Sequence, residues 1–96
     1  MKKMELEKIR TIVETLFAEL LPEAKLVKVE VQEEESREGD ELLNIIIVFD
    51  GKRLDAKKTN ELTWRTHTEL AEDEDRFPMF GFVVKEEAWE MGIALP

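Results

Sequence analysis

The chain has 96 residues, of which 39% are charged, with 23 acids against 14 bases and a formal net charge of −9. With 43% apolar residues, this length predicts one domain, residues 1–96, with a packed core. The negative charge disfavours a broad nucleic-acid surface. The chain lacks cysteine, which is typical of a reducing compartment, and no apolar run approaches the ~20 residues of a membrane span. We therefore expect a cytoplasmic protein that does not enter a membrane.

The first predicted element is an amphipathic helix between Met4 and Leu21. Its apolar residues recur at steps of one and three, as they do on one face of a helix. They are Ile9, Ile12, Val13, Leu16, Phe17 and Leu20. Pro22 ends the helix, because proline disfavours helical backbone in the residue before it. We expect this stripe to pack on a sheet.

Two strands joined by an acidic hairpin are predicted next. Residues 25–33 alternate between valine and polar residues, which indicates a strand with one buried face. The buried positions would be Val27, Val29 and Val31. Residues 33–41 contain the Gly and Asp of a turn and almost no apolar residue. Residues 42–50, LLNIIIVFD, are apolar on both faces, so both faces of this strand require a cover.

A second helix is predicted over residues 56–71, with Asp55 as its N-cap, because a carboxylate accepts hydrogen bonds from the first free N–H groups. Its inward stripe would be Thr59, Leu62, Thr63, Thr66 and Leu70. Trp64 lies roughly 140° from the centre of that stripe, so we expect it to point away from the core. The acidic run EDED at residues 72–75 is interpreted as a charged connector.

The last predicted strand is FPMFGFVV, residues 77–84, which contains no charge. Alternation places Phe80, Phe82 and Val84 on one face. Phe77, Met79 and Val83 lie on the other. A helix between two strands of one sheet makes a right-handed crossover and leaves those strands parallel. The sequence therefore predicts an α+β fold of order α-β-β-α-β, with a three-stranded mixed sheet, two helices on one face and a short C-terminal tail.

Two helices on one face leave the other sheet face uncovered. Each large apolar side chain that stays in water forgoes about 1.5–3 kcal/mol. Either the tail folds back with Trp89, Met91 and Ile93 on the sheet, or a partner protein or second copy covers the face or pairs along the third strand. The candidate partner-binding residues are Trp64, Phe80, Phe82, Val84, Trp89 and Met91. The leading hypothesis is a small interaction protein, self-associating as a homodimer or bound to a protein partner.

Catalytic chemistry has few candidate residues in this chain. It contains one serine, Ser36 in the acidic hairpin, and one histidine, His67 on the second helix, which are not expected to meet. We therefore predict that the protein is not an enzyme and has no cofactor. The acidic hairpin lacks the spacing of a calcium-binding loop, so no metal site is predicted.

Two charged segments provide alternative hypotheses. In the first, the hairpin mimics nucleic acid and captures a DNA- or RNA-binding protein in a salt-sensitive way. Its carboxylates are Glu33, Glu34, Glu35, Glu38, Asp40 and Glu41. In the second, the basic cluster from Lys52 to Arg65 binds RNA weakly, because it surrounds a helix start where free N–H groups favour anions.

Residues 54–88 also carry a recognisable pattern: L-D-x-x-K-[ST], a helix ending near H-x-x-L, an acidic connector and F-P-x-x-x-F. The matching residues are Leu54, Asp55, Lys58, Thr59, His67, Leu70, Phe77, Pro78 and Phe82. This pattern resembles a group of small uncharacterised bacterial α+β proteins. Their association with HEPN-domain neighbours implies a two-gene module such as toxin and antitoxin, with this chain as the antitoxin-like member. The stretch MFGFVVKEEAWE departs from the group, which more often has a Ser-rich stretch there, so the partner surface differs.

Overall fold

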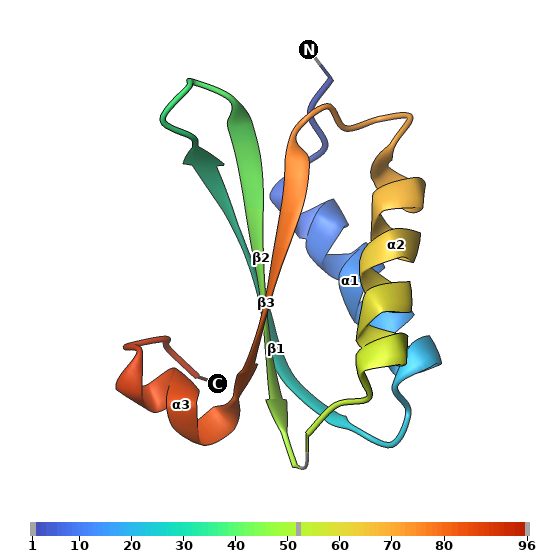
Figure 1. The fold of residues 1–96 in the computed structure, drawn as a ribbon, viewed down its shortest axis with the longest axis vertical. Helices are drawn as coiled ribbons and strands as arrows, with labels where there is room; N and C mark the ends of the chain where they lie inside the picture. Colours follow the sequence, from blue (N-terminus) through green and yellow to red (C-terminus); the bar gives the residue numbers. More distant parts are fainter. Residues whose placement is uncertain (1, 52, 96) are drawn as a thin grey trace.

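The computed structural model of the protein describes residues 2–51 and 53–95 (Figure 1). Its elements are α1 (Leu6–Leu20), β1 (Lys25–Glu35), β2 (Glu41–Asp50), α2 (Ala56–Leu70), β3 (Phe77–Val84) and α3 (Lys85–Glu90). The α+β class and the predicted order α-β-β-α-β are confirmed. The addition is α3, a short helix within the segment that the sequence predicted to be a tail.

The three strands form one sheet in the order β1-β2-β3, with β2 in the centre. β1 pairs with β2 in antiparallel fashion, and β2 pairs with β3 in parallel, so the predicted mixed sheet is confirmed. The hairpin between β1 and β2, the N-terminal segment and the start of β3 lie at the same end of the molecule (Figure 1). β1 and β3 are the two edges of the sheet.

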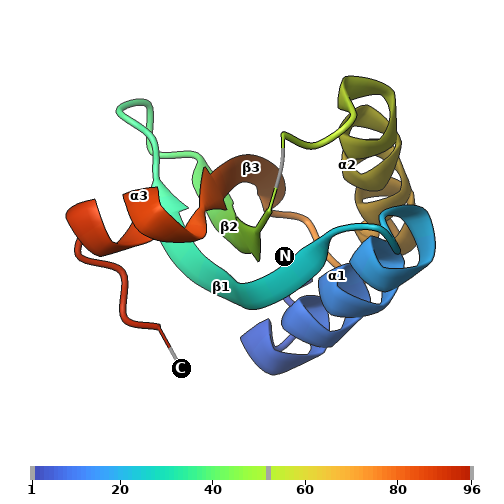
Figure 2. The same cartoon turned by 90° about the horizontal axis from the view of Figure 1, so that it is seen from below.

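The main core fills the space between the sheet and the two long helices, which lie on the same side of it (Figure 2). The predicted stripe of α1 supplies Ile9, Val13 and Phe17, and α2 supplies Leu62 and Leu70, all of them buried. β2 contributes alternate residues, namely Leu43, Ile45, Ile47 and Phe49. One face of β2 is therefore covered by helices, as its period-two pattern requires.

A β-bulge corrects the predicted faces of β1. The pairing with β2 shifts between Leu26 and Lys28, so Val27 is an extra residue in the ladder. Leu26 and Val29 therefore pack in the main core, whereas Val27 packs on the opposite side of the sheet. The prediction that Val27 shares a face with Val29 and Val31 was wrong, because alternation alone does not reveal an inserted residue.

The second sheet face is covered over part of its length by α3 and the residues after it, on the side opposite α1 and α2 (Figure 2). Ala88, Ile93 and Leu95 belong to a small apolar cluster around Val48 and Val83. The Lys28 Nζ donates a hydrogen bond of 2.7 Å to the Ala94 carbonyl and so holds the chain end on β1. Of the two alternatives for this face, the fold-back of the tail is realised for this part of the sheet.

Two residues of the tail that were expected to pack on the sheet do not do so. Trp89 is 68% exposed and Met91 is 61% exposed. Because α3 is amphipathic over less than two turns, Ala88 takes the position against the sheet and its neighbour Trp89 is turned outward. The expectation that Trp89 and Met91 pack on the sheet was therefore wrong, while that for Ile93 is confirmed.

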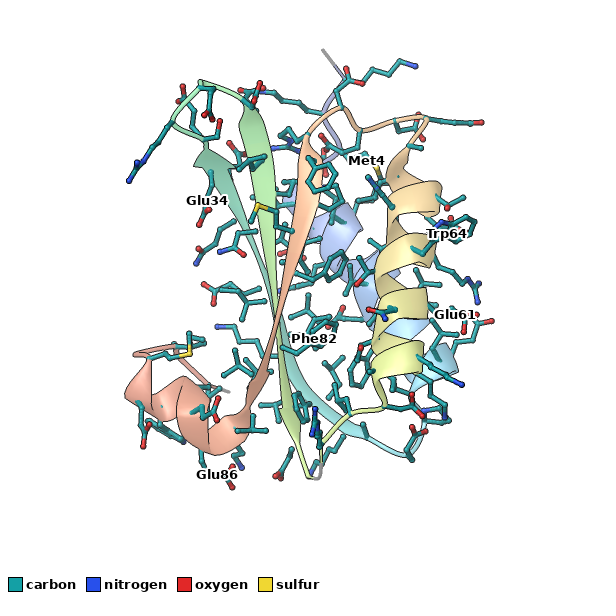
Figure 3. All side chains as sticks on the ribbon, in the orientation of Figure 1. Met4, Glu34, Glu61, Trp64, Phe82 and Glu86 are labelled. Carbon is teal, nitrogen blue, oxygen red and sulfur yellow. The ribbon has the colours of Figure 1, made fainter. Side chains whose placement is uncertain are left out.

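Phe80, Phe82 and Val84 lie on the helix side of β3 and pack against the main core while remaining partly exposed. The rings of Phe80 and Phe82 are stacked, with centroids 6.3 Å apart and planes at 15°. Phe82 lies on the α2 side of the strand (Figure 3). These side chains therefore stabilise the margin of the core, and they are not part of the second sheet face.

We predict that Ile47→Ala lowers the free energy of unfolding by about 2–5 kcal/mol, because it leaves a cavity in a fully buried site. Ile46→Ala is the matched control on the same strand, since Ile46 is only half-buried on the opposite face. Urea unfolding followed by circular dichroism measures both losses. Equal losses for the two variants would contradict the assignment of the main core to the helix side.

Candidate interaction surface

The free edge of β3 differs from the other edge of the sheet. Within the described residues, β2 is the sole strand neighbour of β3, so the outer backbone N–H and C=O groups of β3 lack a ladder partner. Soluble proteins protect such edges with charged side chains, and β1 follows this rule with Lys25, Lys28, Glu30 and the glutamates of residues 33–35. β3 contains no charged residue. Pro78 is its one protective feature, because proline lacks an N–H donor.

An apolar strip lies beside this edge: Met79 belongs to the second sheet face, whereas the Phe77 ring, at the start of β3, lies against His67 of α2. Phe77 is 56% exposed and Met79 is 47% exposed, and both precede the part of β3 that α3 covers. The register places Phe77 next to Leu42 and Gly81 next to Ile46. A Cβ atom built at Gly81 meets no other atom within 4 Å. At the middle of β3, therefore, no side chain projects from the strip, and a neighbouring chain can approach the strand there.

A groove between α2 and the start of β3 forms the second feature, which we call the α2–β3 groove. Its volume is about 580 Å³. One wall is a single face of α2, since positions i, i+3, i+4 and i+7 lie together on a helix. These positions are Trp64, His67, Thr68 and Ala71. Phe77 and Pro78 form the other wall, and the His67 and Phe77 rings meet edge to face at 5.0 Å.

Trp64 is 68% exposed and lies on the side of α2 that faces away from the sheet (Figure 3). The prediction that Trp64 points away from the core is confirmed. A tryptophan held in water on a rigid helix is the residue type that most often anchors a protein interface.

An ion pair at the base of the groove fixes this region. The Arg76 guanidinium donates to both carboxylate oxygens of Glu74, with distances of 2.7 and 2.8 Å, and both residues are buried. The pair also holds the N-terminal segment: Met4 N–H donates to Glu74 at 2.9 Å, and Arg76 donates to the Met4 carbonyl at 2.9 Å. The groove therefore has a rigid, electrically neutral base.

The hydrogen bonds dominate the protonation of this pair. Burial alone would raise the pKa of Glu74, but the hydrogen bonds from Arg76 and from the Met4 N–H outweigh burial and lower the pKa to about 2. Hydrogen bonding to Glu74 raises the pKa of Arg76. Both groups are therefore charged at neutral pH. The interpretation of residues 72–75 as a charged connector missed the burial of Glu74, and an arginine placed directly before an uncharged strand was the available signal of a buried pair.

The carboxylates of the acidic hairpin are partly engaged within the chain. Glu33 contacts Arg76 at 3.4 Å, and Glu41 pairs with Lys3 at 2.9 Å. Glu34 accepts a hydrogen bond from Asn44 at 3.0 Å. Glu35 ends β1, and residues 38 and 40 lie at the turn and just before β2. These contacts reduce the acidic surface that a nucleic-acid mimic would present.

The basic cluster is similarly engaged. Lys58 pairs with Glu23 at 3.2 Å, and Arg65 pairs with Glu19 at 3.3 Å. Asp55 caps α2 as predicted, because its carboxylate accepts hydrogen bonds from the N–H groups of Lys57 and Lys58. The start of α2 therefore already has an anionic partner. Lys52 lies outside the described residues.

We predict that Glu74→Gln lowers the free energy of unfolding at neutral pH by about 3–5 kcal/mol, because it leaves the Arg76 charge buried without its partner. Since folding lowers the pKa of Glu74, its stabilisation is complete above the usual value of 4.5 and is lost as pH falls through about 2.

Urea unfolding followed by circular dichroism between pH 7 and pH 2 therefore shows a smaller acid-induced loss for Glu74→Gln than for the wild type. Glu72→Gln, an exposed change two residues away, is the control and keeps the wild-type profile. Parallel pH profiles for the wild type and Glu74→Gln would contradict the role of the ion pair.

The described residues contain no helix long and apolar enough to cross a membrane and no cluster of side chains suited to a metal ion. Comparison with protein-family models, curated proteins and solved structures gives no match for this chain. The resemblance of residues 54–88 to the bacterial proteins stays a prediction. The features that bear on function are therefore the β3 edge, the apolar strip beside it and the α2–β3 groove.

Proposed function

We propose that the chain is a non-enzymatic interaction protein that associates through the free edge of β3, with a second copy of itself as the partner. The observation that carries the proposal is the uncharged edge from Phe77 to Val84, next to the exposed Phe77 and Met79 side chains. Exposed edges of this kind pair with other strands through their backbone groups.

The charge distribution favours an antiparallel arrangement of the two copies. The acidic hairpin and the acidic connector of residues 72–75 lie at the end of the molecule where β3 begins (Figure 1). Antiparallel pairing of two β3 strands places these acidic ends far apart, whereas parallel pairing would bring them together. A twofold axis through the β3 edge also makes the interface self-complementary. The result is one continuous sheet of six strands.

The apolar strip supports the same arrangement. In an antiparallel pair, the exposed half of one β3 strand lies beside the half of the other strand that α3 covers. Met79 then gains an apolar neighbour near Val83 of the second copy. Complete burial of a large apolar side chain contributes about 1.5–3 kcal/mol, so partial burial of Met79 in each copy adds to the backbone pairing.

The sequence resemblance supports a wider form of this proposal. In that form, the dimer is the antitoxin-like member of a bacterial two-gene module, acting in the cytoplasm. Trp89 on α3 and Met91 directly after it remain exposed in the chain and offer further apolar contacts to a partner protein. This wider role rests on the resemblance of residues 54–88 and on the exposed side chains together.

We predict that light scattering of the wild-type protein at several concentrations gives the mass of two 11.2 kDa chains. Gly81→Lys weakens dimerisation at least about tenfold, or about 1.4 kcal/mol, because it places like charges near each other across the twofold axis. The open space at Gly81 allows the lysine without a clash in the single chain, so circular dichroism and thermal unfolding stay close to wild type.

The matched control is Ala18→Lys, which adds the same charge at an exposed position of α1, away from the edge, and leaves the dimer intact. A wild-type protein that stays monomeric at every concentration would contradict self-pairing. A dimer that Gly81→Lys leaves unchanged would contradict β3 as the interface. Phe80 and Phe82 are unsuitable test positions, because both pack against the core.

A further inference from the structure

The α2–β3 groove has walls that self-pairing of β3 does not need. Trp64 and Thr68 lie four positions apart on α2 and form one side of the groove. The pairing edge, in contrast, belongs to β3 alone. The lining of the groove is mainly apolar, and its aromatic walls, Trp64 and Phe77, are 68% and 56% exposed. Two large aromatic side chains in water on rigid elements form a surface suited to a ligand.

The charged side chains that line the groove leave one negative charge unbalanced. They are Glu74, Asp75 and Arg76, and the Arg76 charge is balanced by Glu74. The Asp75 carboxylate accepts a hydrogen bond of 2.7 Å from the Lys2 backbone N–H, and the Lys2 Nζ donates to the Glu72 carbonyl at 3.0 Å. Glu72 and Asp73 lie exposed in the same connector. The unbalanced charge of Asp75 therefore favours a cationic ligand over an anionic one.

Aromatic walls beside carboxylates favour arginine among cationic side chains. The guanidinium is planar and weakly hydrated, stacks on the face of tryptophan and pairs with a carboxylate in bidentate geometry. An apolar side chain next to the arginine matches the remaining lining from Phe77 and Pro78. Nucleic acid does not fit, because its phosphates would face the unbalanced charge of Asp75.

We propose that the α2–β3 groove binds a short basic segment of another protein, with an arginine against Trp64 and Asp75 and an adjacent apolar side chain against Phe77. The site goes beyond the proposed self-association, since Trp64 and Asp75 lie outside the pairing edge; Phe77, at the start of β3, borders both surfaces. The groove site rests on the proposed function in one respect, namely that the chain binds other proteins.

The test uses the full chain carrying Trp89→Phe, so that Trp64 is its single tryptophan. The probe is the capped tetrapeptide Gly-Arg-Leu-Gly, which is too short to pair along the whole of β3. We expect a saturable change in Trp64 fluorescence at millimolar peptide. Gly-Gln-Leu-Gly, which lacks the charge, produces no saturation. Backbone amide shifts in NMR spectra change around residues 64–71 and 75–77.

The matched variants are Asp75→Asn and Glu61→Gln. Asp75→Asn removes the charge at the groove and keeps an oxygen acceptor for the Lys2 N–H, so the affinity falls about threefold to fivefold. Glu61→Gln removes an exposed carboxylate from the same helix but outside the groove, and the affinity is unchanged. Both variants keep the wild-type circular dichroism spectrum.

Equal effects of the two substitutions would overturn the proposal, because binding would then follow net charge alone. Amide shifts centred on the hairpin, residues 33–41, would also overturn the proposal, because the peptide would then bind the most acidic segment. The absence of saturation would overturn it as well. Light scattering of the same samples separates the two proposals. Failure of both the dimer and the Gly81→Lys monomer to bind the tetrapeptide contradicts the groove site alone, and a Gly81→Lys monomer that binds it supports the groove site independently of the dimer.

Discussion

The two apolar faces of β2 impose the constraint on which the rest of the structure depends. Leu43, Ile45 and Ile47 face α1 and α2, while Ile46 and Val48 face the opposite side. A central strand of this kind requires a cover on each face, because apolar side chains on both sides must leave water. The two long helices meet the requirement on one face completely. On the other face, α3 and the chain end meet it only around Val48 and Val83.

A buried ion pair determines how the start of β3 is held. Glu74 and Arg76 bind each other and both backbone polar groups of Met4, so the N-terminal segment is attached to the connector before β3. A pair of this kind contributes little net stability but is costly to break, since one charge would remain buried. The attachment keeps Phe77 and Asp75 in fixed positions relative to α2. The α2–β3 groove therefore has a defined shape without a ligand.

The two sheet edges support the interaction role that we propose. β1 carries charges along its length and ends in the glutamates of residues 33–35, so it resists pairing. β3 is uncharged, and its exposed aromatic and methionine side chains lie beside the unpaired backbone. Soluble proteins seldom leave such an edge free. The contrast between the two edges of one small sheet supports the proposed docking role of β3. The negative charge at the α2–β3 groove supports the proposed binding of a basic segment there.

The sequence determined the features that depend on local periodicity. The stripe of α1, the N-cap at Asp55, the two-faced pattern of β2 and the outward position of Trp64 all follow from spacing along the chain, and all are confirmed. The α+β class followed as well, because the order of elements and the handedness of a crossover restrict the topology.

Tertiary structure decided the features that depend on contacts between distant segments. The bulge at Val27 changes the face of that residue through the register with β2. Ala88, rather than Trp89, packs against Val48 and Val83, and Trp89 is turned to solvent. The partners of Arg76 lie at Met4, Glu33 and Glu74, and a linear pattern does not encode such a meeting. The position of Phe80 and Phe82 on the helix side likewise required the placement of α2, because alternation defines two faces but not which one the helices cover.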